Sequence, residues 1–188
     1  MRSYNSPRHQ RALFLQEADM TTAVYPGSFD PIHMGHVDVI ERAREIFDRV
    51  VVGVLDNNLK SCLFSAEERS RLVRESVPAG SDLEVVHFSG LAVSFAISQR
   101  AGVIVRGLRA VSDLDSEFQM ALMNRRLEPR VHTVFLTTGF ANVYLSSSLI
   151  KDVCAHGGSI AGLVAPPVEA ALHHRLAPAS GPGQGAVG

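Results

Sequence analysis

Short apolar runs alternate with amphipathic helical patterns from residue 22 onward, and this alternation constrains the fold more than any other feature. The runs are rich in Val, Ile, Thr and Phe, as buried strands are, and they cover residues 22–26, 49–55, 83–88, 103–107 and 132–138. Helical patterns cover residues 36–48, 65–77, 91–101, 112–127, 146–158 and 168–176. Strands separated by helices pair in parallel through crossover connections. The sequence therefore predicts an α/β fold with a Rossmann-like, doubly wound, parallel five-stranded sheet.

Several helix ends carry local signals. Ser65 is followed three residues later by Glu68, the spacing of a capping box. The helix over 112–127 has acids early and arginines late, as the helix dipole favours. Serines open the helix over 146–158 and glycines end it. These signals support the predicted boundaries.

The bulk properties suit a globular protein of one domain. The chain has 188 residues, a formal net charge of −1 and 46% apolar residues, enough for a sizeable core. The near-zero charge argues against a nucleic-acid or membrane-surface binder, and no apolar run approaches the roughly 20 residues that span a bilayer. Two separated cysteines, Cys62 and Cys154, fit a reducing cytoplasm.

We place the domain over residues 20–177. Residues 1–19 lack the apolar core of a secretory signal, and we expect a flexible extension there. Residues 178–188 are mostly Pro, Gly, Ala and Ser, which cannot build a core, so we expect a disordered tail. We find no internal repeat in the domain.

Polar and basic residues follow the ends of the predicted strands. Lys60 lies after the second strand, Arg106 and Arg109 follow the fourth, and 146–148 is a run of serines after the fifth. In open parallel sheets, ligands bind outside the carboxyl ends of the strands. This gathering of positive and hydrogen-bonding groups predicts an anionic ligand, most simply a phosphate.

The loop after the first strand has the features of a phosphate-binding site. The stretch GSFDPIHMGH contains glycines that let the backbone approach a ligand, and a helix begins near His36. The first turn of that helix directs free N–H groups at the ligand, and the His36 ring can donate to a phosphate oxygen. The stretch matches neither the GxGxxG dinucleotide motif nor the P-loop.

Other interpretations of these residues remain open. His33 and His36 could bind a metal ion, but no third ligand has a suitable spacing, and His33 could be an ordinary residue at a helix start. Lys60 could be a solvated charge. Arg106 and Arg109 could form ion pairs with acids that follow them, and the serines could simply cap a helix. The candidate acids are Asp113, Asp115 and Glu117.

Three segments resemble a known family. GSFDPIHMGH resembles the T/HxGH motif of the nucleotidyltransferase α/β superfamily, and SSSLIKD resembles its serine-containing motif. The block RGLRAVSDLDSEFQMALMNRRL resembles bacterial phosphopantetheine adenylyltransferases more narrowly. The resemblance runs without obvious gaps over residues 22–176.

This resemblance implies transfer of AMP from ATP to 4′-phosphopantetheine, which gives dephospho-coenzyme A and pyrophosphate and uses Mg²⁺. Members of the family are typically homohexamers, and coenzyme A can act on them as a feedback ligand. From the cysteine usage and the near-zero charge we expect a cytoplasmic enzyme with no nucleic-acid or membrane partner.

The resemblance assigns roles to particular residues. His36 would be the transition-state stabiliser, and Ser28, Lys60, Ala92 and Arg106 would bind phosphopantetheine. From the chemistry of the reaction we take His36, Lys60 and Arg109 as the catalytic residues. The residues implied to bind ATP are Ser28, Phe29, His36, Gly107, Leu108, Arg109, Glu117, Asn142, Val143, Tyr144, Leu145, Ser146, Ser147 and Ser148. The stretch TTGFANVY departs from the family, because it lacks the Pro and the basic residue expected before the serines.

The residues suit direct in-line attack by a phosphate monoester, which is already mostly dianionic near neutral pH. His36 and Lys60 would stabilise the α-phosphate, and Arg109, the serines and Mg²⁺ would neutralise the β- and γ-phosphates. Two alternatives remain. One is a sister nucleotidyltransferase that uses nicotinate mononucleotide or glycerol 3-phosphate, and the other is a nucleotide-binding regulatory module without catalysis.

Overall fold

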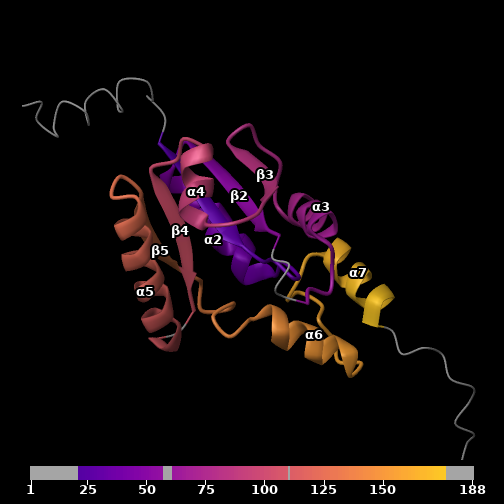
Figure 1. Cartoon of the computed structure of the whole chain (residues 1–188). Helices are drawn as coiled ribbons and strands as arrows, with labels where there is room; N and C mark the ends of the chain where they lie inside the picture. Colours follow the sequence, from indigo (N-terminus) through magenta and orange to yellow (C-terminus); the bar gives the residue numbers. More distant parts are fainter. Residues whose placement is uncertain (1–20, 57–60, 110, 177–188) are drawn as a thin grey trace, which may run out of the picture.

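The computed structural model describes residues 21–56, 61–109 and 111–176 (Figure 1). Its strands form one parallel sheet in the order β3-β2-β1-β4-β5. They are β1 (Thr22–Gly27), β2 (Arg49–Leu55), β3 (Leu83–Phe88), β4 (Val103–Leu108) and β5 (His132–Thr137). The predicted extension over 1–19, the predicted tail over 178–188 and Lys60 lie outside the described residues.

Helices connect the strands and follow the last one. They are α2 (Met34–Ile46), α3 (Ala66–Ser76), α4 (Ala92–Ser98), α5 (Val111–Leu127), α6 (Ser147–Ala155) and α7 (Pro166–Leu176). None of the helices in the described ranges has both the length and the apolar character needed to cross a membrane.

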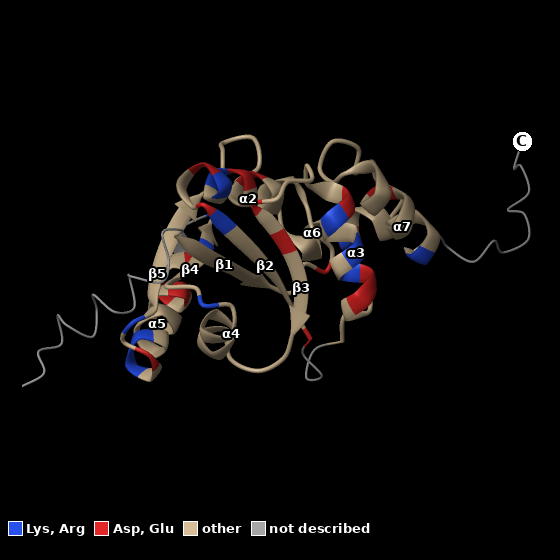
Figure 2. Cartoon of the chain, turned by 90° about the horizontal axis from the view of Figure 1, so that it is seen from above, with Lys and Arg blue, Asp and Glu red and all other residues tan. Residues whose placement is uncertain are grey.

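The helices cover both faces of the sheet. Figure 2 shows α4 and α5 on one face and α2 and α3 on the other, with α6 and α7 beside α3. Within a strand, neighbouring side chains pack beneath helices on opposite faces of the sheet. Tyr25 of β1 packs into the core beneath α2, whereas its neighbour Val24 packs into the core beneath α4. Because successive side chains of a strand point to opposite faces, a sheet covered on both faces needs continuous apolar runs.

The predicted fold class is confirmed, and the boundaries of β2 and β3 are those expected. The predicted capping box of α3 is present, since Ser65 Oγ accepts from Glu68 N–H at 3.2 Å and Glu68 Oε2 accepts from Ser65 N–H at 2.8 Å. The fourth strand extends to Leu108, one residue beyond the predicted end.

Helix ends depart more from the predictions. α2 begins at Met34, two residues before the predicted start, with His33 in an extended conformation as its N-cap. α4 ends at Ser98 because Arg100 has a left-handed backbone with φ of 54°. α6 ends at Ala155, and Gly157 has the positive φ of 76° that glycine tolerates.

The strand order reverses between β1 and β4. From β1 the chain continues outward through β2 to β3, whereas β4 lies on the other side of β1 and is followed by β5. The connections therefore leave the carboxyl ends of β1 and β4 in opposite directions. This reversal opens the crevice in which doubly wound folds bind ligands.

Candidate active site

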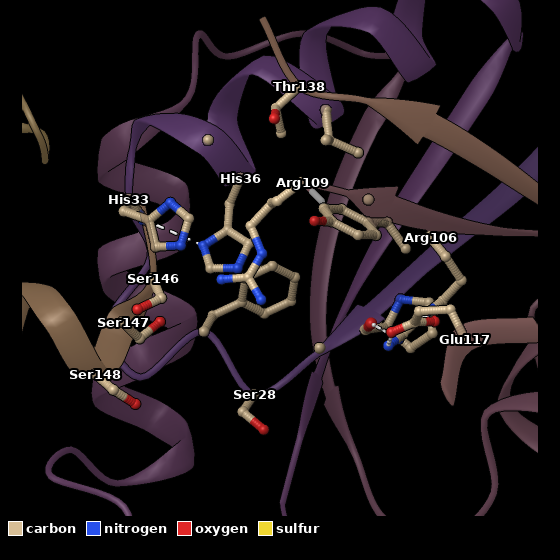
Figure 3. A pocket seen from close by; sticks show the side chains of 17 residues that line it. Ser28, His33, His36, Arg106, Arg109, Glu117, Thr138, Ser146, Ser147 and Ser148 are labelled. Carbon is tan, nitrogen blue, oxygen red and sulfur yellow. Dashed lines mark hydrogen bonds and ion pairs between the residues drawn. The ribbon is translucent and has the colours of Figure 1, made fainter. Parts of the chain in front are cut away.

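A cavity of about 330 Å³ opens at the carboxyl ends of β1 and β4. In Figure 3 its side chains converge from the loop after β1, from α2, from β4 and α5, and from the start of α6. The lining residues are Tyr25, Pro26, Gly27, Ser28, Phe29, His33, Gly35, His36, Val39, Arg106, Gly107, Arg109, Glu117, Thr138, Ser146, Ser147 and Ser148.

The loop after β1 places an aromatic ring beneath the histidines. Phe29 has φ of 48°, and its buried ring lies edge-on to Tyr25 at 5.4 Å and to His36 at 5.0 Å between centroids. A side chain at Gly27 would put its Cβ 2.9 Å from the Phe29 ring, so only glycine leaves room for this turn. The Phe29 ring therefore packs against the His36 ring and limits its movement.

The two histidines form a stacked pair in which the proton of His36 has a defined place. Their ring centroids lie 3.7 Å apart with 28° between the planes. His36 Nδ1 accepts a hydrogen bond of 3.3 Å from the backbone N–H of His33. An accepting Nδ1 carries no proton, so the proton of the neutral ring is on Nε2.

The surroundings of His36 favour this neutral form. Burial, followed by the charges of His33, Arg109 and Arg106, lowers the pKa of His36 well below 6.5. A neutral imidazole can still donate one hydrogen bond through Nε2–H. His36 is therefore a fixed hydrogen-bond donor at the cavity and holds no positive charge near pH 7.

Two buried polar atoms of the described residues have no hydrogen-bond partner within the chain, His33 Nδ1 and Thr138 Oγ1. Both residues line the cavity. Burial, and more weakly the charge of Arg109, lowers the pKa of His33 to about 4, so its ring is also neutral. Buried polar groups are nearly always satisfied in native proteins. These two atoms are therefore unpaired polar groups buried beneath the surface of the cavity.

Asp30 connects three separate segments beside the cavity. Its buried carboxylate accepts from the backbone N–H groups of Leu63 at 2.9 Å and Phe64 at 3.0 Å, and from Lys151 Nζ of α6 at 2.8 Å. Burial opposes ionisation, but the hydrogen bonds from Lys151, Leu63 and Phe64 outweigh it and hold the pKa of Asp30 below 3.8. The carboxylate thus fixes the loop after β1 against α6 and against the segment before α3.

The start of α6 presents three serines to the cavity. Ser146 Oγ caps the helix by accepting from Leu149 N–H at 3.1 Å, as the capping interpretation expected. Ser147 Oγ donates to the Pro31 carbonyl at 2.8 Å, and Ser148 is exposed. All three nevertheless line the cavity. The positive end of the helix dipole and its free N–H groups therefore face the same space as His36.

Arg106 forms a bidentate ion pair at the side of the cavity. Its Nε and Nη2 atoms each donate to Glu117 at 2.6 Å, and Nη1 donates to the Pro26 carbonyl at 2.9 Å. A guanidinium has five N–H donors, so two remain for a ligand. Glu117 orients Arg106 and balances its charge.

Arg109 joins the starts of two helices. Its guanidinium donates to Asp113 of α5 at 3.1 and 3.5 Å and to the Leu145 carbonyl before α6 at 3.0 Å. The ion-pair alternative is thus realised for Arg109 with Asp113 and for Arg106 with Glu117. Both arginines still line the cavity, so ion pairing and a place at the site do not exclude each other.

The structure brings most of the predicted site residues together. Those that line the cavity are Ser28, Phe29, His36, Arg106, Gly107, Arg109, Glu117, Ser146, Ser147 and Ser148. Those that do not are Ala92, Leu108, Asn142, Val143, Tyr144 and Leu145. Lys60 falls outside the described residues. The ligand contacts of all these residues stay predictions.

Sequence reasoning missed two polar residues of the site, Tyr25 and Thr138. Tyr25 lies inside a predicted strand and Thr138 at the end of one, and both residue types are common in strands. Their patterns carry no signal for a ligand site.

The described ranges contain no group of three His, Cys, Asp or Glu side chains that could hold a metal ion. His33 and His36 are used in stacking and in the bond that orients His36. A metal ion bound in a cage of these side chains therefore does not fit the described part of the chain.

Comparisons with known proteins agree with this geometry. Residues 24–153 match the family model described as cytidylyltransferase-like. The chain is 51% identical over 153 residues to the phosphopantetheine adenylyltransferase of Heliobacterium modesticaldum, covering 81% of this chain and 91% of that protein. It is 47% identical over 157 residues to the proteins of the same name from Desulfosudis oleivorans and Carboxydothermus hydrogenoformans, covering 84% of this chain and 94% and 97% of theirs.

A solved structure shows the same fold at low identity. The chain superposes with a TM-score of 0.55 on a putative nicotinate-nucleotide adenylyltransferase from Vibrio parahaemolyticus. The two are 17% identical, and the match covers 82% of this chain and 91% of that one.

Proposed function

The chain belongs to the phosphopantetheine adenylyltransferase family, and from that premise we propose that it transfers AMP from ATP to 4′-phosphopantetheine. The products are dephospho-coenzyme A and pyrophosphate. The observation that carries this proposal is the convergence of His36 Nε2–H, Arg106, Arg109 and the start of α6 on one cavity. Such a set of donors lets two anionic substrates approach each other despite their mutual repulsion.

The reaction proceeds by direct in-line attack of the acceptor phosphate on the α-phosphorus of ATP, and pyrophosphate leaves. A phosphate monoester with a second pKa of about 6 is already dianionic at neutral pH. It therefore needs no general base, and His36, whose proton is on Nε2, is placed as a donor instead. Catalysis then consists of positioning the substrates and stabilising the charge that develops in the transition state.

Each group at the cavity has a part in this scheme. His36 Nε2–H and Lys60 stabilise the α-phosphate, and Arg109 with the serines of α6 stabilises the leaving pyrophosphate. Arg106, held by Glu117, directs its two remaining N–H donors at the acceptor phosphate. Ser28 also lines the cavity, and its hydroxyl would serve either substrate.

Mg²⁺ enters this proposal as part of the nucleotide substrate. It binds best to phosphate oxygens and water and seldom needs a cage made only of protein groups. Bound to ATP, it would neutralise negative charge on the triphosphate. The described residues offer no three-ligand metal group, so we assign no step to a protein-bound ion.

The experiment that tests this function is incubation with ATP, Mg²⁺ and 4′-phosphopantetheine, with dephospho-coenzyme A and pyrophosphate measured together. Nicotinate mononucleotide and glycerol 3-phosphate serve as control acceptors. Turnover with 4′-phosphopantetheine alone supports the proposal. Turnover only with another acceptor, or ATP binding without turnover, would replace it by one of the alternatives raised from the sequence.

A homohexamer is the assembly we propose, with α5 covered by a second copy of the chain. Apolar side chains of α5 are unusually exposed, with Phe118 at 53%, Met123 at 52% and Leu127 at 51% of their full area. Leu91 and Ile97, at and within the neighbouring α4, are exposed to a similar degree. Apolar patches of this kind mark protein interfaces.

Two further properties belong to the same proposal. Coenzyme A contains both an adenine nucleotide and a phosphopantetheine arm, so it could occupy the site of both substrates as a feedback ligand. A cytoplasmic location agrees with the two cysteines, since Cys62 and Cys154 are free thiols in the structure.

A further inference from the structure

Arg69 of α3 is a buried positive charge that the proposed mechanism does not use. The residue is only 2% exposed. No acid of the described residues forms an ion pair with it, and the segment over 57–60 contains no acidic residue. Charged groups in protein interiors are normally paired, because burying a lone charge is costly. The charge of Arg69 therefore lacks a counter-ion within the described part of the chain.

The guanidinium of Arg69 is held by backbone carbonyls of three separate segments. Nη1 donates to the Ser28 carbonyl at 2.5 Å and to the Leu55 carbonyl at 2.9 Å, and Nε donates to the Phe64 carbonyl at 3.0 Å. Ser28 itself lines the cavity, Leu55 ends β2, and Phe64 precedes α3. Carbonyl oxygens satisfy N–H donors but carry no net charge. A full positive charge therefore remains directly behind a residue of the cavity wall.

The acids closest to these segments are already paired with other cations. Asp30, which accepts from the N–H of Phe64, forms its ion pair with Lys151, and Glu68 of α3 forms its ion pair with Arg175. Arg69 also lies near the start of α3, where the helix dipole disfavours a positive charge. Neither the neighbouring charges nor the helix therefore favours a cation at this position.

We propose that Arg69 is a positioning residue whose counter-ion is the phosphate of bound 4′-phosphopantetheine. It acts without touching the substrate, by holding the Ser28 carbonyl and by placing its charge behind the cavity wall. Charges interact strongly at a distance where little water screens them. The acceptor is favoured over ATP because Arg69 binds Ser28 and both ends of the segment that contains Lys60, two residues assigned to phosphopantetheine. The proposal rests on the proposed function, which supplies this acceptor.

The test compares dissociation constants of a charged and an uncharged acceptor for the full chain, measured by titration calorimetry without ATP. Arg69→Met removes the charge and keeps most of the length, and we expect 4′-phosphopantetheine to bind about tenfold more weakly. Pantetheine lacks the phosphate, so its affinity should stay within about twofold of the wild type. The affinity for MgATP, measured separately, should fall by less than about threefold.

Two matched variants separate this role from a structural one. Arg69→Lys retains the charge, so its affinity for 4′-phosphopantetheine should stay within about threefold of the wild type. Arg74→Met removes a charge from the same helix, where Arg74 Nη2 donates to the Val85 carbonyl at 2.8 Å away from the cavity lining, and should change no affinity. Melting temperatures establish which variants are folded. If Arg69→Met is not, the Arg69→Lys variant decides, and a loss of about tenfold or more despite the retained charge refutes the proposal.

Three results with a folded Arg69→Met variant would overturn the proposal. The first is wild-type affinity for 4′-phosphopantetheine. The second is an equal loss for pantetheine, which would make the role of Arg69 structural, and the third is an equal loss for MgATP, which would assign the charge to the nucleotide. Because these measurements need no turnover, they remain readable if no dephospho-coenzyme A is formed, which would instead count against the proposed function.

Discussion

Lys151 of α6 donates a hydrogen bond of 2.8 Å to Asp30 in the loop after β1, across a sequence separation of 121 residues. This contact joins the segment that leads to His36 with the helix whose start carries the serines. A second bond, from Ser147 Oγ to the Pro31 carbonyl at 2.8 Å, reinforces it. The starts of α2 and α6 are thereby held as one unit.

The first prediction concerns the stability of this joint. Asp30→Ala leaves Lys151 without its partner and two backbone N–H groups without their acceptor. We expect a loss of about 2–4 kcal/mol in the free energy of unfolding, measured by urea denaturation. Lys151→Met removes a partly exposed partner and leaves both backbone hydrogen bonds to Asp30 in place, so it should cost less, about 1 kcal/mol. Equal stability of the Asp30→Ala variant and the wild type would show that Asp30 does not hold the segments together.

The second prediction concerns His36. His36→Ala removes the Nε2–H donor, and kcat should fall by about 10²–10³, the usual effect of losing one transition-state hydrogen bond. The dissociation constant of ATP should change less, because other groups also bind the phosphates. His132→Ala, at the opposite end of the sheet, is the control. A His36→Ala variant within a few-fold of wild-type kcat would contradict the assigned role.

The third prediction concerns the pH dependence of the rate. Because the pKa of His36 lies well below 6.5 in the folded protein, His36 stays neutral across the neutral range. The decline of kcat/KM on acidification should then follow the second ionisation of the acceptor phosphate, with a midpoint at about pH 6. The His36→Gln variant, although slower, should show the same midpoint. A midpoint that moves in this variant would assign the ionisation to the enzyme.

The fourth prediction concerns stability at acidic pH. Burial lowers the pKa of His33 to about 4 from 6.5, so the unfolded chain binds a proton more readily than the folded one between these values. The free energy of unfolding therefore falls as the pH drops below 6.5. His33 should contribute a loss of about 2 kcal/mol by pH 5. Urea denaturation at pH 7 and pH 5 should show a smaller loss for His33→Asn, and an unchanged loss would exclude this source.

The fifth prediction concerns the assembly. If a second copy covers α5, the double change Phe118→Asp and Met123→Asp should place charges in the interface and dissociate the hexamer. Size-exclusion chromatography with light scattering would report the smaller mass. Gln119→Asp, an exposed polar position on the same helix, is the control and should retain the assembly. A wild-type chain that is already monomeric at micromolar concentration would refute the proposal.

Much of the fold could be predicted because its signals are local. Val-rich runs such as 49–55 need only their own composition to indicate a buried strand, and Ser65 with Glu68 marks a helix start within four residues. Boundaries failed where a local signal was ambiguous. Arg100 is an example, since an arginine side chain does not predict the left-handed backbone conformation that this residue adopts after α4.

The sequence by itself determined that Ser28, His36, Arg106, Arg109 and the serines over 146–148 lie at one edge, since parallel strands bring their carboxyl ends together in any order. Only the tertiary structure decided the strand order, the ion pairs of both arginines and the proton position of His36. It alone also placed Asp30 against Lys151 and Thr138 at the cavity. The reason is physical: periodicity and caps report interactions within a few residues, whereas these contacts join segments far apart along the chain and depend on how the sheet and helices pack.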